Sequence, residues 1–426
     1  MLHRTRGARK SAFERDSSRI RLALHRNRPH TPVNGRATAA RIGPRGDDDP
    51  RRAHDARAGF GRHLARIRPM PSITDPHQRL ARIGWRAQAL PEGTDPAAIA
   101  RVVAQHRAGY QLHDGNDMFN AQPAARFLKR DLDPTERPAV GDFVLVAAGS
   151  PPTIERVLPR RTELKRGAAG ESHQRQLIAA NVDAVFVLSG LDHDFNPARI
   201  ERYLLLIQGS GATPVLVLTK ADRTEAVDAV VDDLRRRVPG VDVHAVNAKA
   251  ADSVAPLLAY LGPGHTAVLV GSSGAGKSTL TNTLLGESRQ ATGAVREHDS
   301  RGRHTTTHRA LILLPSGGCL IDTPGMRELK LTGEEQIDQG QFADIDELAQ
   351  SCRFGDCAHA NEPGCAVRAA LADGRLDPDR WRNYLKLRDE LAATADTLEA
   401  QMRRKGEAKV LTKALGKRLN EKYGRH

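Results

Sequence analysis

The segment 271-GSSGAGKS-278 has the residue types and spacing of a loop that binds nucleotide phosphates. It fits G-x-x-x-x-G-K-[ST] in full, follows the apolar run AVLV and precedes the helical stretch STLTNTLL. Glycines let backbone N–H groups turn toward phosphates, and the following helix adds its positive end. We expect Lys277 to reach the β- and γ-phosphates and the Ser278 hydroxyl to ligate Mg²⁺. The assigned residues are Gly271, Ser272, Ser273, Gly274, Ala275, Gly276, Lys277, Ser278 and Thr279.

A second phosphate-sensing segment, 318-GCLIDTPG-325, ends another apolar run. Asp322 is placed to hold Mg²⁺ through a water molecule, and the Gly325 N–H can meet a γ-phosphate. DTPG alone is also typical of a plain turn. Its distance from the phosphate loop favours the γ-phosphate sensor.

Between these segments lies 302-GRHTTTHR-309, which we interpret as a switch loop. Thr306 is the candidate for a second Mg²⁺ hydroxyl, with Thr305 and Thr307 as alternatives. Gly325 is followed by Met326, whose thioether cannot orient an attacking water molecule. His304 is therefore the nearest candidate for that catalytic role by sequence, although it could also only pack locally. Intrinsic hydrolysis should be slow.

The stretch 214-PVLVLTKAD-222 predicts a buried strand that delivers a base-reading loop. Asp222 can accept hydrogen bonds from the N1–H and amino group of guanine, which adenine does not offer in this arrangement. The Lys220 stem would cover the ring, with Thr219 and Ala221 completing the loop. Thr219 stands where Asn is usual, so an amide that braces this loop is missing. The later segment 247-NAK-249, with Asn247 and Ala248, resembles the loop that supports the base from the other side.

The order of these motifs along the chain is base, base support, phosphate, switch and γ-sensor. This order is a circular permutation of the usual small GTPase, and it is possible because termini often lie close together on a domain surface. The switch and γ-sensor then lead directly into the C-terminal segment.

That segment contains 352-CRFGDCAHANEPGC-365, with the spacing C-x4-C-x-H-x5-C. Three thiolates and one imidazole form the ligand set of a closed structural Zn²⁺ site, so the predicted ligands are Cys352, Cys357, His359 and Cys365. Incidental reduced cysteines are the alternative. The fourth thiol, Cys319, is expected in the core.

Length and composition limit the number of domains and the kinds of location that the chain could have. A chain of 426 residues with 39% apolar residues is expected to form two to four globular domains. We find no apolar stretch near the roughly 20 residues of a membrane span and no signal-peptide core. The expected location is the cytoplasm, with no membrane partner and a monomeric state.

The net charge of +14 is concentrated at the two ends. Residues 1–70 hold 18 Lys and Arg against 6 Asp and Glu, which gives +12. This segment could be a basic nucleic-acid arm, an organelle transit peptide or sequence upstream of a true start at Met70, and we favour the last. Residues 401–426 hold 9 Lys and Arg against 2 Asp and Glu, which gives +7. Their helical pattern indicates either a solvated helix face or a nucleic-acid contact.

The predicted architecture is multidomain. Short strands such as 141–146 and 153–159 indicate a small β-barrel, and the apolar runs alternating with helical stretches between 184 and 270 indicate a parallel α/β sheet. The predicted divisions are 1–75 basic extension, 76–167 OB-fold, 168–333 permuted GTPase domain, 334–405 helical zinc-binding domain and 406–426 basic tail.

The permuted order, GSSGAGKST, GRHTTT, DTPG, the cysteine cluster with EPGCAV and the preceding IAANVDAVFVLSG together resemble the ribosome small subunit-dependent GTPase family RsgA. The resemblance covers roughly residues 75–405. It implies an N-terminal OB-fold, a permuted GTPase domain, a C-terminal zinc domain, contacts with rRNA and a role in late maturation of the small (30S) ribosomal subunit. The departures are Thr219, Asn247 in place of Ser, and the long segment before Met70.

Two functions remain open from the sequence. The first is a GTP hydrolase that is stimulated by the small subunit and released from it by hydrolysis. The second is an RNA-binding module in which GTP or GDP acts only as a conformational switch. Turnover in the presence of small subunits distinguishes them.

Overall fold

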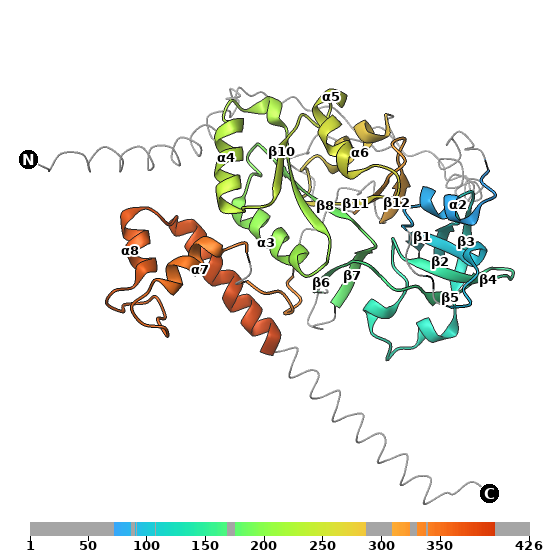
Figure 1. The fold of residues 1–426 in the computed structure, drawn as a ribbon, viewed down its shortest axis with the longest axis horizontal. Helices are drawn as coiled ribbons and strands as arrows, with labels where there is room; N and C mark the ends of the chain where they lie inside the picture. The colour runs from blue at the N-terminus through green and yellow to red at the C-terminus, as the bar shows by residue number, and fades with distance from the viewer. Residues whose placement is uncertain are drawn as a thin grey trace, which may run out of the picture.

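The computed structural model describes residues 72–86, 90, 92–106, 108–167, 175–286, 309–323, 330–337 and 340–396. A small barrel, an α/β sheet and a helical region follow one another along the chain (Figure 1). The predicted basic tail and most of the predicted basic extension lie outside the described residues. Within the described ranges, no helix combines the length and the apolar character needed to cross a membrane.

The N-terminal strands close into a barrel. They are β1 (Ile99–His106), β2 (Gly109–His113), β3 (Met118–Pro123), β4 (Phe143–Ala147) and β5 (Thr153–Val157), with 3-10 turns η3 (Pro96–Ala98), η4 (Ala125–Leu128) and η5 (Pro134–Glu136). The order around the ring is β1-β2-β3-β5-β4, and β4 pairs back with β1. Val102, Leu112 and Ile154 are fully buried inside it. This closed barrel of five strands confirms the predicted OB-type fold.

One side of the barrel is covered by helix α2 (Pro76–Arg82). Asp75 caps this helix by accepting a hydrogen bond from the His77 N–H at 2.9 Å. Leu80 packs in one buried cluster with Ile99 and Phe143 of the barrel strands. The helix therefore closes a second small core on the outside of the barrel.

The central domain is a six-stranded sheet in the order β10-β9-β8-β11-β13-β12. Its strands are β8 (Ala184–Gly190), β9 (Thr213–Thr219), β10 (Asp242–Ala245), β11 (Thr266–Gly271), β12 (Ala310–Leu313) and β13 (Cys319–Asp322). Neighbouring strands are parallel except for β12, which is antiparallel to β13. Strands β8 and β11 are buried at every position, as expected where helices cover both faces. The predicted parallel α/β sheet is confirmed.

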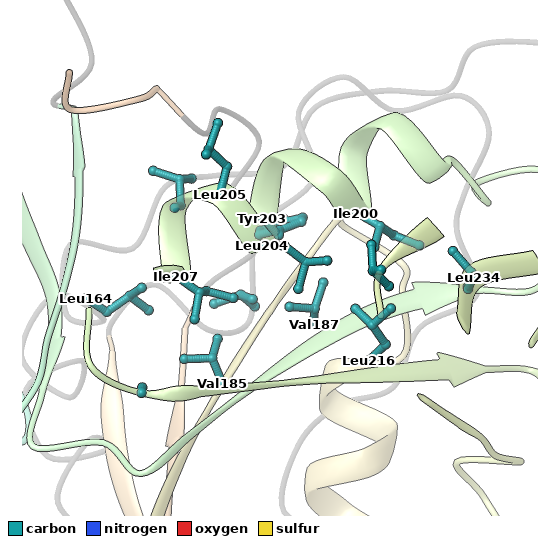
Figure 2. Packing of buried hydrophobic residues seen from close by; sticks show 14 of the residues in the cluster. Leu164, Val185, Val187, Ile200, Tyr203, Leu204, Leu205, Ile207, Leu216 and Leu234 are labelled. Atoms are coloured by element: carbon teal, nitrogen blue, oxygen red, sulfur yellow. The ribbon is translucent and has the colours of Figure 1, made fainter. Parts of the chain in front are cut away.

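The helices divide between the two faces. Their bounds are α3 (Pro197–Gln208), α4 (Val227–Arg237), α5 (Ala251–Val254) and α6 (Lys277–Leu285), with 3-10 turns η6 (Ala221–Arg223) and η7 (Ala255–Tyr260). Alternate residues of β8 point to opposite faces, so Val185 and Val187 pack with Leu204 of α3 (Figure 2), whereas Phe186 packs with Leu280 of α6. Helices α3 and α4 thus cover one face, and α5 and α6 the other.

The barrel and the central sheet are joined at two places. Ala104 of β1 pairs with Ala310 of β12, which makes one continuous sheet of both domains. Beside this contact Arg101 is fully buried, and it donates to the Thr266 hydroxyl at 2.8 Å, to the Asn181 carbonyl at 2.9 Å and to the Gly141 carbonyl at 3.0 Å. A guanidinium with these partners holds both domains in one arrangement.

A two-stranded hairpin, β6 (Glu163–Gly167) with β7 (Arg175–Ala180), leads from the barrel into the sheet. Its Gly167 forms an isolated bridge with Lys330, which lies shortly before the C-terminal part.

The C-terminal part is helical, as predicted, with α7 (Ala343–Gln350), α8 (Ala366–Asp373) and a helix over residues 378–396. It attaches to the central domain through charged contacts: Arg237 of α4 pairs with Asp377 at 2.7 Å, and Arg202 of α3 donates to Glu390 at 2.9 Å.

Candidate nucleotide-binding site and metal cluster

The predicted phosphate loop connects the centre of the sheet to a helix. Strand β11 ends at Gly271, and helix α6 starts at Lys277. Gly276 has a φ of +94°, in the left-handed region that favours glycine. At Gly271, a side chain would bring its Cβ to 2.5 Å from the Leu188 carbonyl oxygen. The loop therefore has the strand–loop–helix context that the motif requires, with its backbone at the N-terminus of α6.

Lys277 is folded into this loop. Its Nζ donates to the carbonyl oxygens of Gly271 at 2.7 Å and of Ser272 at 2.6 Å. Burial lowers the pKa of Lys277 to about 8, and the charges of Asp322 and Asp194 partly oppose this shift. Burial disfavours the charged form of this ammonium, and a negatively charged phosphate group beside it would favour that form.

Asp322 lies beside the phosphate loop because β13 is the parallel neighbour of β11, with Leu269 opposite Asp322. The Asp322 carboxylate is buried, and the next residue, Thr323, donates its hydroxyl to the Leu269 carbonyl at 2.7 Å. This position suits the predicted Mg²⁺ role. His304, Thr306 and Gly325 lie outside the described residues.

The predicted base-reading loop meets the predicted phosphate loop directly. Thr219, at the end of β9, donates its Oγ1 to the Ala275 carbonyl at 2.7 Å. The hydroxyl thus ties the two loops together and supplies a brace that the sequence suggested was lost. Lys220 adopts a left-handed conformation with φ 60°, which directs the chain into the turn that carries Asp222.

The second base-side segment lies next to the first. The Ala221 N–H bonds to the Val246 carbonyl at 3.2 Å, and the Asn247 side chain accepts from the Lys249 N–H at 3.0 Å, which shapes its own loop. Thr283 of α6 donates to the Ala248 carbonyl at 2.6 Å. All these loops follow the carboxyl ends of parallel strands, the usual ligand-binding edge of such sheets.

Sequence reasoning missed two carboxylates in the loop after β8. Asp192 pairs with Lys220, with 2.6 Å between Oδ2 and Nζ, and Asp194 accepts a hydrogen bond from the Ser272 hydroxyl. Their position in the sequence could have indicated them, because they directly follow an apolar strand. That strand, β8, is the sheet neighbour of both β9 and β11.

The four predicted metal ligands come together. One potential ligand atom from each of Cys352, Cys357, His359 and Cys365 lies within 4.8 Å of the others. The Cys352 and Cys365 sulfurs are 3.6 and 3.5 Å from His359 Nδ1. The two sulfurs are 3.9 Å apart, too far for a disulfide.

The surroundings of the cluster suit thiolate ligands. Backbone N–H groups point at two of the sulfurs, from Ala366 to Cys352 at 3.4 Å and from Arg368 to Cys365 at 3.5 Å. The His359 ring meets Trp381 edge to face at 5.7 Å, which connects the cluster to the helix of residues 378–396. A Cys₃His set of this geometry suggests zinc. Cys319 is buried in β13, away from the cluster, as predicted.

Comparison with known proteins agrees with this geometry. Residues 157–332 match the family described as RsgA GTPase. The Small ribosomal subunit biogenesis GTPase RsgA of Xanthomonas axonopodis pv. citri (strain 306) is 54% identical over 346 residues, covering 78% of this chain and 94% of the relative. The protein of the same name from Xanthomonas euvesicatoria pv. vesicatoria (strain 85-10) is 56% identical over 336 residues, covering 76% of this chain and 91% of the relative.

A solved structure has a similar fold. The crystal structure of YjeQ from Thermotoga maritima aligns with a TM-score of 0.50 and 25% identity, covering 69% of this chain and 98% of that chain. In the present chain the base loop after β9 precedes the phosphate loop after β11, the permuted order predicted from the motifs. The extent of the identity to the Xanthomonas proteins shows that this chain belongs to the RsgA family of small ribosomal subunit biogenesis GTPases, with a circularly permuted GTPase domain.

Proposed function

We propose that this chain binds GTP with Mg²⁺ and hydrolyses it on the small ribosomal subunit, and that hydrolysis releases it late in maturation of that subunit. Family membership supports the proposal. The structural observation that carries it is the 2.7 Å hydrogen bond from Thr219 to the Ala275 carbonyl. This bond joins the two loops that must hold opposite ends of one nucleotide.

In this proposal Asp222 reads the guanine base by accepting hydrogen bonds from its N1–H and amino group. Lys220 covers one ring face, and the Asn247 and Ala248 segment supports the other side. Both GTP and GDP present the same base edge, so both are proposed ligands. The remaining base contacts are assigned to Thr219 and Ala221.

The phosphates would lie along the backbone of residues 271–279, with Lys277 at the β- and γ-phosphates. Ser278 is the proposed direct Mg²⁺ ligand, and Asp322 is proposed to hold the ion through water. When bound, Mg²⁺ would neutralise charge that develops on the phosphates during transfer. Thr306 and Gly325 are the proposed further Mg²⁺ and γ-phosphate contacts.

Hydrolysis needs a group that orients water. Met326 follows Gly325 and cannot supply one, so His304 is the proposed positioning group. We propose that docking on the small subunit brings His304 into position and thereby stimulates turnover.

The C-terminal cluster is proposed to hold one structural Zn²⁺. Four protein ligands would close the coordination shell, so the ion would stabilise the fold and take no part in the reaction. The barrel and the basic tail are the proposed rRNA contacts, and the chain is proposed to work as a monomer in the cytoplasm.

Co-sedimentation with purified small and large subunits tests the function, with GDP and with a non-hydrolysable GTP analogue, alongside GTP turnover. We expect the GTP analogue to retain the protein on small subunits, GDP to release it, and small subunits alone to stimulate turnover. Nucleotide-dependent binding without stimulated turnover would instead favour an RNA-binding module that uses the nucleotide only as a switch.

A further inference from the structure

The loop of residues 191–196, between β8 and α3, touches both ends of the proposed nucleotide site. At the base end, Asp192 Oδ2 lies 2.6 Å from Lys220 Nζ. At the phosphate end, the Asp194 carboxylate accepts the hydrogen bond of the Ser272 hydroxyl. Two carboxylates only two residues apart therefore act on different parts of one site.

Asp194 is held in place from the side of α3. Arg199 Nη1 lies 2.6 Å from Asp194 Oδ1, so one carboxylate oxygen faces Arg199 and the other faces the phosphate loop. The neighbouring Tyr203 of α3 is buried, and the Gly271 backbone partly offsets the rise in the pKa of this tyrosine that burial causes. Arg199, in the first turn of α3, thus holds the carboxylate that contacts Ser272 of the phosphate loop.

The charge of Asp194 reaches the phosphate-binding position. Ser272, which donates its hydroxyl to Asp194, also accepts a hydrogen bond from Lys277 Nζ at its backbone carbonyl, at 2.6 Å, and Lys277 is the residue assigned to the β- and γ-phosphates. A carboxylate and an ammonium that contact the same residue are close together, so the carboxylate also repels phosphate oxygens bound to that ammonium. The repulsion is greater for GTP than for GDP, because GTP carries one more phosphate group.

We propose that Asp194 sets the relative affinity for GTP and GDP: held on the phosphate loop through Ser272, its carboxylate disfavours the additional charge of GTP, and Arg199 moderates this effect. The inference rests on the proposed function, in which residues 271–279 bind the phosphates of a guanine nucleotide. The free protein is then biased toward GDP by a residue outside the phosphate-loop motif.

The test measures the dissociation constants of fluorescent GDP and of a fluorescent non-hydrolysable GTP analogue, with Mg²⁺, at low and high salt. Asp194→Asn keeps an oxygen that accepts the Ser272 hydroxyl but removes the charge. We expect the affinity for GTP relative to GDP to rise roughly three- to tenfold, as for a unit charge several ångströms away in a partly screened site. Higher salt should reduce the difference.

Arg199→Gln is the second variant, and its expected effect has the opposite sign. Without the guanidinium, the Asp194 charge is less neutralised, so the affinity for GTP relative to GDP should fall. The Arg199 side chain is 38% exposed, which makes this substitution compatible with folding.

Asp192→Asn is the matched control because it makes the same chemical change in the same loop. Asp192 pairs with Lys220 at the base end of the site. GTP and GDP have the same base, so the affinities for both nucleotides should change by the same factor. If Asp194→Asn and Arg199→Gln bind both nucleotides with the wild-type affinity ratio, the inference is overturned and the proposed function stands. A wild-type protein that binds neither nucleotide overturns both.

Discussion

Glu201 and Arg380 form an ion pair between the GTPase domain and the C-terminal helix, with 2.6 Å between Oε1 and Nη1 and each side chain only 3% exposed. Asn383 also donates to Glu201, at 2.5 Å, and Asp344 lies 2.7 Å from Arg380. Burial raises the pKa of Glu201 even though Arg380 and Asn383 oppose the shift. The carboxylate is therefore stable as an anion only while its partners stay in place.

Arg380→Met should lower the free energy of unfolding by about 3–5 kcal/mol, because it leaves Glu201 buried without its main cation. Urea denaturation followed by circular dichroism measures the loss. Because the folded-state pKa of Glu201 is raised above the ordinary glutamate value of 4.5, the folded protein takes up this proton more readily than the unfolded chain. Protonation removes the unpaired charge, so the difference in unfolding free energy between wild type and Arg380→Met should shrink as the pH falls toward 4.5.

Arg382→Ala provides the comparison. Arg382 is 73% exposed and pairs with Asp379 at the surface of the same helix. Its removal should change the stability by less than about 1 kcal/mol. Equal losses from both variants would contradict a special role for the buried pair.

Asp222→Asn should shift base preference from guanine toward xanthine. The amide replaces a pair of acceptors with one acceptor and one donor, and xanthine offers a carbonyl oxygen where guanine has its amino group. Competition between GTP and XTP for the purified protein measures the change. The assignment of Asp222 fails if this variant keeps the wild-type preference for GTP.

The purified protein should contain about one Zn²⁺, and Cys357→Ser should lose it, because all four ligands are needed to close the site. The variant should also become more sensitive to proteolysis in the C-terminal part. Cys319→Ser changes a thiol outside the cluster and should keep the metal. Metal analysis distinguishes the two variants, and full retention in Cys357→Ser would exclude it as a ligand.

Lys277 should make the stability of the nucleotide-free protein rise with pH in alkaline buffer. The folded-state pKa is about 8 against an ordinary value of 10.5, so between these values the unfolded chain binds more protons. Lys277→Met should be more stable than wild type at pH 7, by on the order of 1–3 kcal/mol, and the gap should close toward pH 10. Denaturation curves for both proteins across this range provide the measurement; a constant gap would contradict the lowered pKa.

His304→Ala should bind GTP and small subunits normally but lose most of the stimulated turnover. The expectation follows from Met326, which cannot orient water, and from the imidazole that the switch sequence offers instead. Single-turnover hydrolysis with small subunits measures the effect, and large subunits serve as the control. Full stimulation of the variant would mean that backbone groups or the subunit itself, and not His304, orient the attacking water.

The sequence predicted those parts of the fold that depend on local patterns. Apolar runs with helical stretches between them indicated the parallel sheet, and Gly276 with Lys277 marked the phosphate loop at the start of a helix. Cysteine spacing identified the cluster. The predicted domain boundaries, the base and phosphate contacts and the switch residues stay predictions.

Contacts between distant segments were not predictable in the same way. The pairing of Ala104 with Ala310 and the burial of Arg101 depend on how two domains meet, which no local pattern encodes. Thr219 shows the limit for a single residue. Its hydroxyl replaces the expected amide because the phosphate loop passes close to it, where a Cβ on Gly276 would lie 3.3 Å from Thr219 Oγ1.

The permuted sheet also has a consequence for synthesis of the chain. Strands β8, β9 and β10 are neighbours in both sequence and space, joined by α3 and α4, whereas β11 must add to the free edge of β8. Such contiguous units can form as the chain emerges during translation. We therefore expect the half with β8, β9 and β10, which carries the proposed guanine-reading loop, to fold first and to serve as the template on which the half with β11 assembles. Protease resistance of nascent chains stalled with residues up to 262 exposed would report this order directly.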